Sequence, residues 1–281
     1  MLNRLPNNKF SEINQEDPVI FVQLPDTGGL AYCQALNIVY EDNYIYTNST
    51  AMLDETVIFN KKAYAGYFNL GHKFYENIPK KFNHLVILRQ PFERFISSYY
   101  AVLSDKNHPY HEQFSAVSLE EFCADPNLIN LFRNDLLINT LSSMFVKDKP
   151  CGATQRAKFN ITNFFTLFGL SERFEEFLIM SKCNLGWEDF DYSPFYSVYQ
   201  PPKIEISKAA SNKINEFVRR DNDIYNFAVS LYEERLPSLL PESERKKYFD
   251  MKTKFDTKIT SSSIFSTISK SFKKLLFWKK S

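Results

Sequence analysis

Cysteine and histidine are scarce in this sequence, and they do not occur in patterns that bind metals. The 281 residues include four widely spaced cysteines, Cys33, Cys123, Cys151 and Cys183, and four histidines. CxxC, HxxxH and HExxH patterns are all missing, so we expect neither a structural zinc site nor any other metal. A disulfide framework is also not expected in a chain of this size, which favours reduced thiols and a cytoplasmic location.

Long hydrophobic runs and an excess of either charge are missing as well. Because no apolar run reaches 18 residues, a transmembrane helix is not expected. Residues 1–17 are polar and lack the apolar core of a signal peptide, so they are interpreted as a flexible leader. The 34 Lys and Arg balance 33 Asp and Glu, which argues against nucleic acid as a partner. The 44% hydrophobic content suffices for a sizeable core.

Apolar runs alternate with helical patterns between residues 18 and 236, which we take as one domain. The sequence predicts strands that begin at residue 19 and span residues 44–46, 55–59, 84–88 and 164–168. It predicts helices over 30–40, 92–103, 119–145 and 204–236, the last as one helix or two, and a further helix capped by Ser171. Such alternation is typical of an α/β fold whose mainly parallel central sheet is flanked by helices.

Two features fall at the carboxyl ends of the predicted strands, where ligands bind in sheets of this kind. The first strand ends in the turn Asp26–Gly29, which opens a helix, and a helix N-terminus favours an anion. Arg89 ends the strand 84–88, and Ser97 follows on the next helix, so that together they form a candidate phosphate clamp. Taken separately, an ordinary tight turn explains the first feature equally well, and a surface arginine with a half-buried serine explains the second better.

Six short motifs together resemble a known family. They are LPDTGG at 24–29, GH at 71–72, LRQPFERFISSYY at 88–100, NDLLINTL at 134–141, FGLSERF at 168–174 and DIYNFA at 223–228. Their order and spacing are similar to those of the sulfotransferase family that includes heparan sulfate 2-O-sulfotransferase. The resemblance covers residues 19 to 232, and it is strongest in the segment 88–100.

The resemblance implies a three-layer, P-loop-like fold and a sulfuryl transfer from PAPS (3′-phosphoadenylyl sulfate) to a hydroxyl group, usually on a carbohydrate. Arg89 and Ser97 would hold the 3′-phosphate of PAPS, and His72 would be the general base, a task that suits imidazole. A packed or surface histidine explains His72 equally well. The 5′-phosphosulfate would lie on the turn formed by Asp26, Thr27, Gly28, Gly29 and Leu30.

Three residues of the turn depart from the family pattern. Asp26 stands where the family has a lysine, and Leu30 and Ala31 replace two hydroxyl residues. Losing a charge-assisted hydrogen bond costs roughly 1.5–3 kcal/mol, so catalysis is expected to be weak. The alternative hypothesis is a catalytically inactive nucleotide-binding or interaction module on the same fold.

Residues 237–281 form a Ser/Thr-rich, basic tail, interpreted as an appendage. Apolar residues near one helical face lie among five lysines close to its end: Phe265, Ile268, Phe272, Leu275 and Leu276, with Lys270, Lys273, Lys274, Lys279 and Lys280. This pattern is typical of a helix that lies on an anionic membrane surface. A disordered tail and a helix packed on the domain are the alternatives.

We expect the full chain to float with vesicles that contain anionic lipid, and a chain that ends at Asp256 to stay in the soluble fraction. Liposome flotation measures this difference. Equal flotation of the two chains would contradict a membrane role for the tail.

Overall fold

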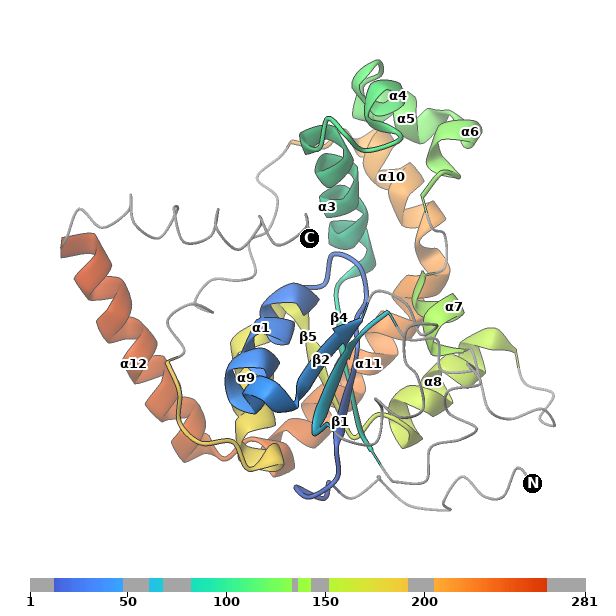
Figure 1. Ribbon diagram of the computed structural model, residues 1–281. Coiled ribbons are helices and arrows are strands. Elements are labelled where there is room, and N and C mark those ends of the chain that lie inside the picture. The colour runs from blue at the N-terminus through green and yellow to red at the C-terminus, as the bar shows by residue number, and fades with distance from the viewer. Residues whose placement is uncertain are drawn as a thin grey trace.

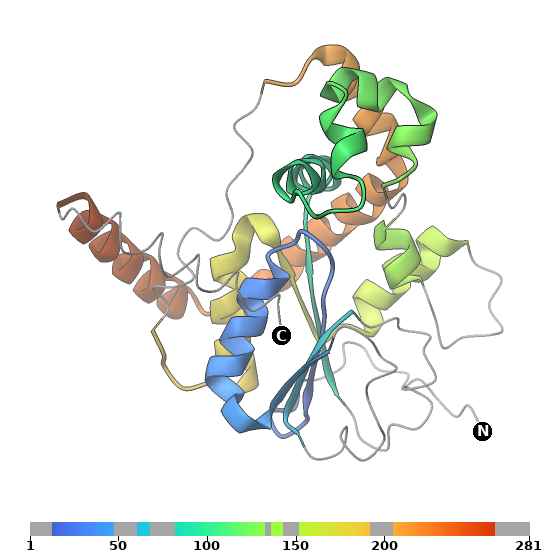
Figure 2. The same ribbon diagram turned by 45° about the horizontal axis from the view of Figure 1, so that its top comes forward.

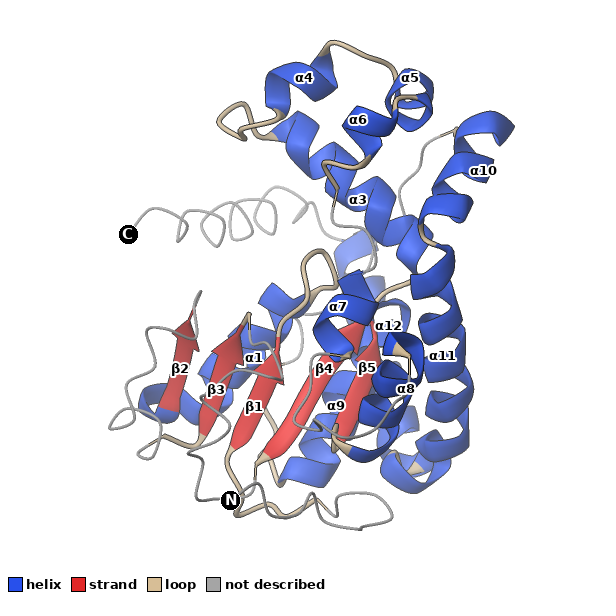
Figure 3. Cartoon of the chain, turned by 90° about the vertical axis from the view of Figure 1, so that its right-hand side faces the viewer, coloured by secondary structure: helices blue, strands red, loops and turns tan. Residues whose placement is uncertain are grey.

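The centre of the fold is a sheet of five parallel strands. The computed structural model describes residues 13–47, 61–67, 82–132, 136–142, 152–191 and 205–261. The strands are β1 (Val19–Val22), β2 (Tyr44–Thr47), β3 (Ala63–Gly66), β4 (Asn83–Leu88) and β5 (Leu167–Leu170), in the order β2-β3-β1-β4-β5. All four neighbouring pairs are parallel. The predicted α/β class with a parallel sheet is therefore confirmed (Figure 3).

Helices flank the sheet on both faces. α1 (Gly29–Tyr40), followed by the short 3-10 turn Glu41–Asn43, lies on one face together with α9 (Phe174–Leu185). α7 (Leu136–Leu141) and α8 (Ala153–Asn163) lie on the other, and α11 (Arg219–Leu239) runs alongside β5 (Figures 2 and 3). The strands β1, β4 and β5 are buried along their whole length, as expected for a sheet covered on both faces.

A second, smaller core lies beyond the carboxyl ends of the strands. Here α3 (Pro91–Ser104) leaves β4 and packs with α4 (His111–Ser115), α5 (Leu119–Ala124), α6 (Pro126–Ile129) and α10 (Lys208–Phe217) (Figure 3). Phe122 is fully buried among Phe95, Tyr99 and Phe114, with ring centroids 4.6–6.3 Å apart. This helical cap therefore sits above the edge of the sheet where the candidate site was predicted.

Several predicted boundaries are wrong for local reasons. The expected helix 119–145 is broken, because Pro126 cannot continue α5 and Asp125 instead caps α6. The strand expected at 164–168 begins three residues later at Leu167, after the end of α8. β3 was not predicted, and the expected strand 55–59 lies outside the described residues.

The fold also extends beyond the expected domain limits. α11 continues through Pro237 to Leu239, and α12 (Glu242–Ser261) then places Tyr248, 1% exposed, against the main core. The start of α12 lies beside α9 (Figure 1). Lys252 of α12 pairs with Glu175 of α9 at 2.6 Å. At the other end, the amide of Asn83 donates to the carbonyl of Asn14, which ties part of the expected leader to β4. None of the described helices is both long and apolar enough to cross a membrane.

Gly169 in β5 is a position where a larger residue would disturb the packing of the sheet against α9. A Cβ atom there would lie 2.3 Å from Cγ of Phe177, which is itself fully buried on α9. We expect Gly169→Ala to lower the free energy of unfolding by about 1–3 kcal/mol, measured by urea denaturation.

Gly152→Ala is the matched control. Its Cβ would meet only the far end of the exposed Gln155 side chain, so a loss under about 1 kcal/mol is expected. Equal losses for the two variants would show that the contact between β5 and α9 is not tightly packed.

Candidate functional site

The turn between β1 and α1 needs both of its glycines. Gly28 has φ 80°, in the left-handed region that favours glycine. A Cβ on Gly29 would lie 2.9 Å from Cγ of Gln23, so a side chain there would push against the end of β1. Asp26 also has a positive φ, 58°, which aspartate tolerates better than most residues. The backbone is therefore shaped to bring the first turn of α1 close to the edge of the sheet.

Side chains from three other elements hold this turn in place. Arg89, at the end of β4, donates from Nη1 to the carbonyl of Asp26 at 2.9 Å. Ser171, directly after β5, donates its hydroxyl to the carbonyl of Thr27 at 3.0 Å. Ser98 on α3 donates to Oδ2 of Asp26 at 2.5 Å. The turn is thus fixed by β4, α3 and the segment after β5.

Within the described part of the chain, four N–H groups of the turn have no acceptor. Among the described residues, none accepts a hydrogen bond from the backbone N–H of Thr27, Gly28, Gly29 or Leu30. The first N–H groups of any helix lack partners within the helix, and they are usually satisfied by caps, water or ligands. Gly28, at the cap position of α1, has no side chain to offer. The arrangement is therefore chemically suited to an anion.

Both arginines near the turn are buried among carboxylates. Arg89 is 8% exposed; burial lowers its pKa, while the charges of Glu93, Glu172 and Asp26 oppose that shift. Arg94 on α3 is 7% exposed and lies 3.5 Å from Asp221. Burial lowers the pKa of Arg94 as well, opposed first by Asp221 and then by Asp26. The carboxylate of Asp26 thus lies near two guanidinium groups, which also have other carboxylates as neighbours.

Hydrogen bonds connect several of the short motifs to one another. Glu172 accepts from the backbone N–H of Gln90 and from the hydroxyl of Tyr225, both at 2.8 Å. Asp221 accepts from the N–H groups of Leu137 and Ile138 at the start of α7. Segments that are far apart in the sequence therefore meet around the carboxyl edge of the sheet.

The structure brings together most of the predicted site residues. Asp26 to Leu30 and Arg89 meet at the turn, where Leu30 is 52% exposed. Ser97 is half-buried, and within the described part of the chain it makes no hydrogen bond to the turn. The serine that contacts the turn is its neighbour Ser98. His72 lies outside the described residues.

Sequence reasoning missed the roles of three residues. Ser98 and Arg94 lie on the same helix as Ser97, but the sequence of that helix does not reveal which serine meets the turn. Ser171 was predicted to cap a helix; instead its hydroxyl binds the carbonyl of Thr27, and α9 begins after Arg173 with no side-chain cap. Only the pairing of β4 with β5 brings Ser171 beside the turn, so no local signal could have identified it.

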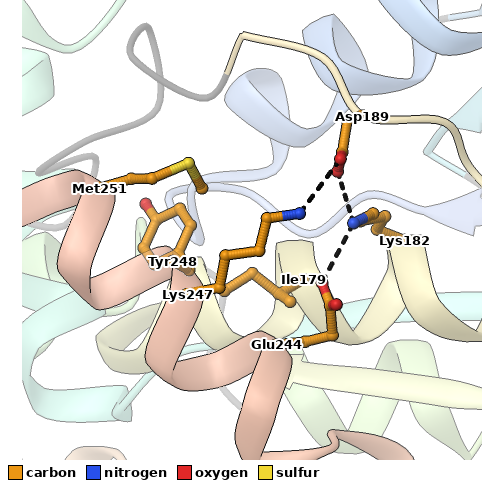
Figure 4. Close-up of a pocket in the computed structure, with 7 residues that line it drawn as sticks. All are labelled: Ile179, Lys182, Asp189, Glu244, Lys247, Tyr248 and Met251. Carbon is orange, nitrogen blue, oxygen red and sulfur yellow. Dashed lines mark hydrogen bonds and ion pairs between the residues drawn. The ribbon is translucent and has the colours of Figure 1, made fainter.

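A shallow pocket elsewhere does not belong to this site. It lies between α9 and α12 and is lined by Ile179, Lys182, Asp189, Glu244, Lys247, Tyr248 and Met251 (Figure 4). Lys182 pairs with Asp189 at 2.5 Å and Glu244 at 3.1 Å, and Lys247 pairs with Asp189 at 3.2 Å. These charges bind one another, so we interpret the pocket as part of the contact that holds α12 on α9. The described residues contain no group of three or more potential metal ligands.

Comparison with known proteins points to a distant structural likeness. No protein-family model and no curated protein matches the chain. Among solved structures, the chain is similar to the crystal structure of mouse sulfotransferase SULT7A1 complexed with PAP. The sequence identity is 14% and the TM-score 0.39, over 94% of this chain and 90% of that one. A likeness this distant carries no weight by itself, so the site is judged by its own geometry.

Ser171 offers a direct test of the support beneath the turn. Ser171→Ala leaves the buried carbonyl of Thr27 without its donor, and we expect unfolding to become easier by about 1–3 kcal/mol. Ser104→Ala is the control, because Ser104 makes the same type of bond, to the carbonyl of Tyr100, at an exposed position. Its effect should stay within about 0.5 kcal/mol in the same urea titration. If the two variants lose the same free energy of unfolding, the Ser171 hydrogen bond does not hold the turn.

Proposed function

We propose that this protein is a sulfotransferase-like enzyme of P-loop-like fold that binds PAPS at the carboxyl edge of its sheet. It transfers the sulfuryl group to a hydroxyl of a carbohydrate or another small acceptor. The observation that carries the proposal is the supported turn between β1 and α1. The N–H groups of Thr27 to Leu30 have no acceptor among the described residues, and Arg89 contacts the turn directly. An anion and a neighbouring phosphate suit this pair of features.

The proposed roles follow from the chemistry of each group. The turn N–H groups hold the 5′-phosphosulfate, and Arg89, with Ser97 of α3, holds the 3′-phosphate. The acceptor oxygen forms a new bond to sulfur while the bond from sulfur to the 5′-phosphate oxygen breaks, which releases PAP. The acceptor proton passes to a base, for which His72 remains the candidate. Fixed N–H donors stabilise charge that develops on the leaving phosphate.

Catalytic inactivity is the second candidate, and one observation favours it. The carboxylate of Asp26 stands at the turn where a cation would assist the leaving group, and Glu93 and Glu172 also face Arg89. Under this alternative the site binds a 3′-phosphorylated nucleotide without turnover. The acceptor class, the cytoplasmic location and a peripheral membrane contact through the tail are parts of the proposal that rest on the sequence alone.

Nucleotide binding tests the proposal. We expect PAP to bind more tightly than ADP, because only PAP carries the 3′-phosphate. Arg89→Gln should weaken PAP by about 10- to 100-fold, the equivalent of one charge-assisted hydrogen bond, and should weaken ADP less. Isothermal titration calorimetry measures both affinities. Equal affinities for PAP and ADP in the parent protein would contradict the proposal.

A control is needed because Arg89 also supports the turn. Ser171→Ala removes a support of the same turn without removing a charge, so it should affect PAP and ADP alike. If Arg89→Gln behaves in the same way, Arg89 is structural and does not contact the 3′-phosphate. Release of PAP from PAPS with carbohydrate acceptors then separates the enzyme from the inactive module.

A further inference from the structure

The carboxylate of Asp26 is held in a fixed position beside the turn. Its Oδ2 accepts from the hydroxyl of Ser98, and its backbone carbonyl accepts from Arg89, so neither the side chain nor the backbone is free to swing away. Asp26 and Thr27 are consecutive, which places their Cα atoms about 3.8 Å apart. An anion on the N–H groups of Thr27 to Leu30 therefore lies close to the carboxylate of Asp26.

Arg89 and Arg94 do not cancel this charge for a ligand. Both guanidinium groups interact with Asp26, but Arg94 lies beside Asp221 and Arg89 also faces Glu93 and Glu172. Four carboxylates thus surround two arginines. A phosphate at Arg89 pairs with a guanidinium group, whereas a second phosphate on the turn N–H groups lies beside the carboxylate of Asp26 without a cation of its own.

We propose that Asp26 is a specificity-determining residue that penalises negative charge at the 5′ position of the bound nucleotide. The inference rests on the proposed function and refines it. The parent protein accepts adenosine 3′-phosphate nearly as well as PAP, because repulsion from Asp26 offsets the hydrogen bonds that the turn offers to a 5′-phosphate.

Asp26→Asn is the cleanest variant for a test. Its amide oxygen still accepts from Ser98, asparagine tolerates the positive φ of this position, and only the charge is lost. Lysine would instead lose the Ser98 bond and place a third positive charge beside Arg89 and Arg94. Adenosine 3′-phosphate and PAP are titrated calorimetrically into the parent protein and into Asp26→Asn.

The expected result is a change in the ratio of the two affinities. In the parent protein PAP binds less than about tenfold more tightly than adenosine 3′-phosphate, and in Asp26→Asn this preference grows by about tenfold. This increase in the preference for PAP should be smaller at 1 M salt, where the screening length falls to about 3 Å. Ser98→Ala, which keeps the carboxylate but removes the hydrogen bond that holds it, should increase the preference less than Asp26→Asn does.

The outcomes separate this inference from the proposed function. If the ratio is the same in the parent protein and in Asp26→Asn, or if Ser98→Ala reproduces the effect of Asp26→Asn, the inference is wrong while the proposed function stands. If neither nucleotide binds to either protein, the proposed function fails and this inference fails with it.

Discussion

The hydrogen bond from Arg89 to the carbonyl of Asp26 is the contact on which the site depends. It joins the ends of β4 and β1, two neighbouring strands of a parallel sheet, and so fixes the turn relative to α3. Because all five strands are parallel, their carboxyl ends meet at one edge, and the groups that follow them converge there. Without this contact, the glycines of the turn would leave the start of α1 free to adopt other conformations.

The same arrangement places carboxylates around the arginines of the site. Buried arginines that support a backbone need carboxylates nearby, and here Glu172 and Asp221 also tie α3, α7 and α11 together through backbone N–H groups and Tyr225. Each of these acids stabilises the fold and weakens the field that would attract a phosphate. An anion site built this way must rely on fixed N–H groups more than on net charge.

Much of the fold could be predicted from local patterns. The apolar runs of β1 and β4 and the glycine turn are visible in the sequence, since they depend on neighbouring residues only. β3 was not predicted, because Ala63–Gly66 is four residues long and has no β-branched side chain. Its strand conformation comes from pairing with β1 and β2. β5 was placed early because Phe164 and Phe165 are apolar yet follow α8. The break at Pro126 was visible in the sequence and was overlooked.

The choice between Ser97 and Ser98 shows where sequence reasoning about the site stops. Successive residues of a helix point about 100° apart, so the two hydroxyls face different directions. Periodicity places both near one face of α3, but only the crossing of α3 over the β1 turn selects Ser98 for the Asp26 carboxylate. Ser98 therefore binds the carboxylate of Asp26. Ser97, on the adjacent part of the helix surface, makes no hydrogen bond to the turn within the described part of the chain. A serine pair of this kind can divide two tasks, one hydroxyl for the fold and one for a ligand.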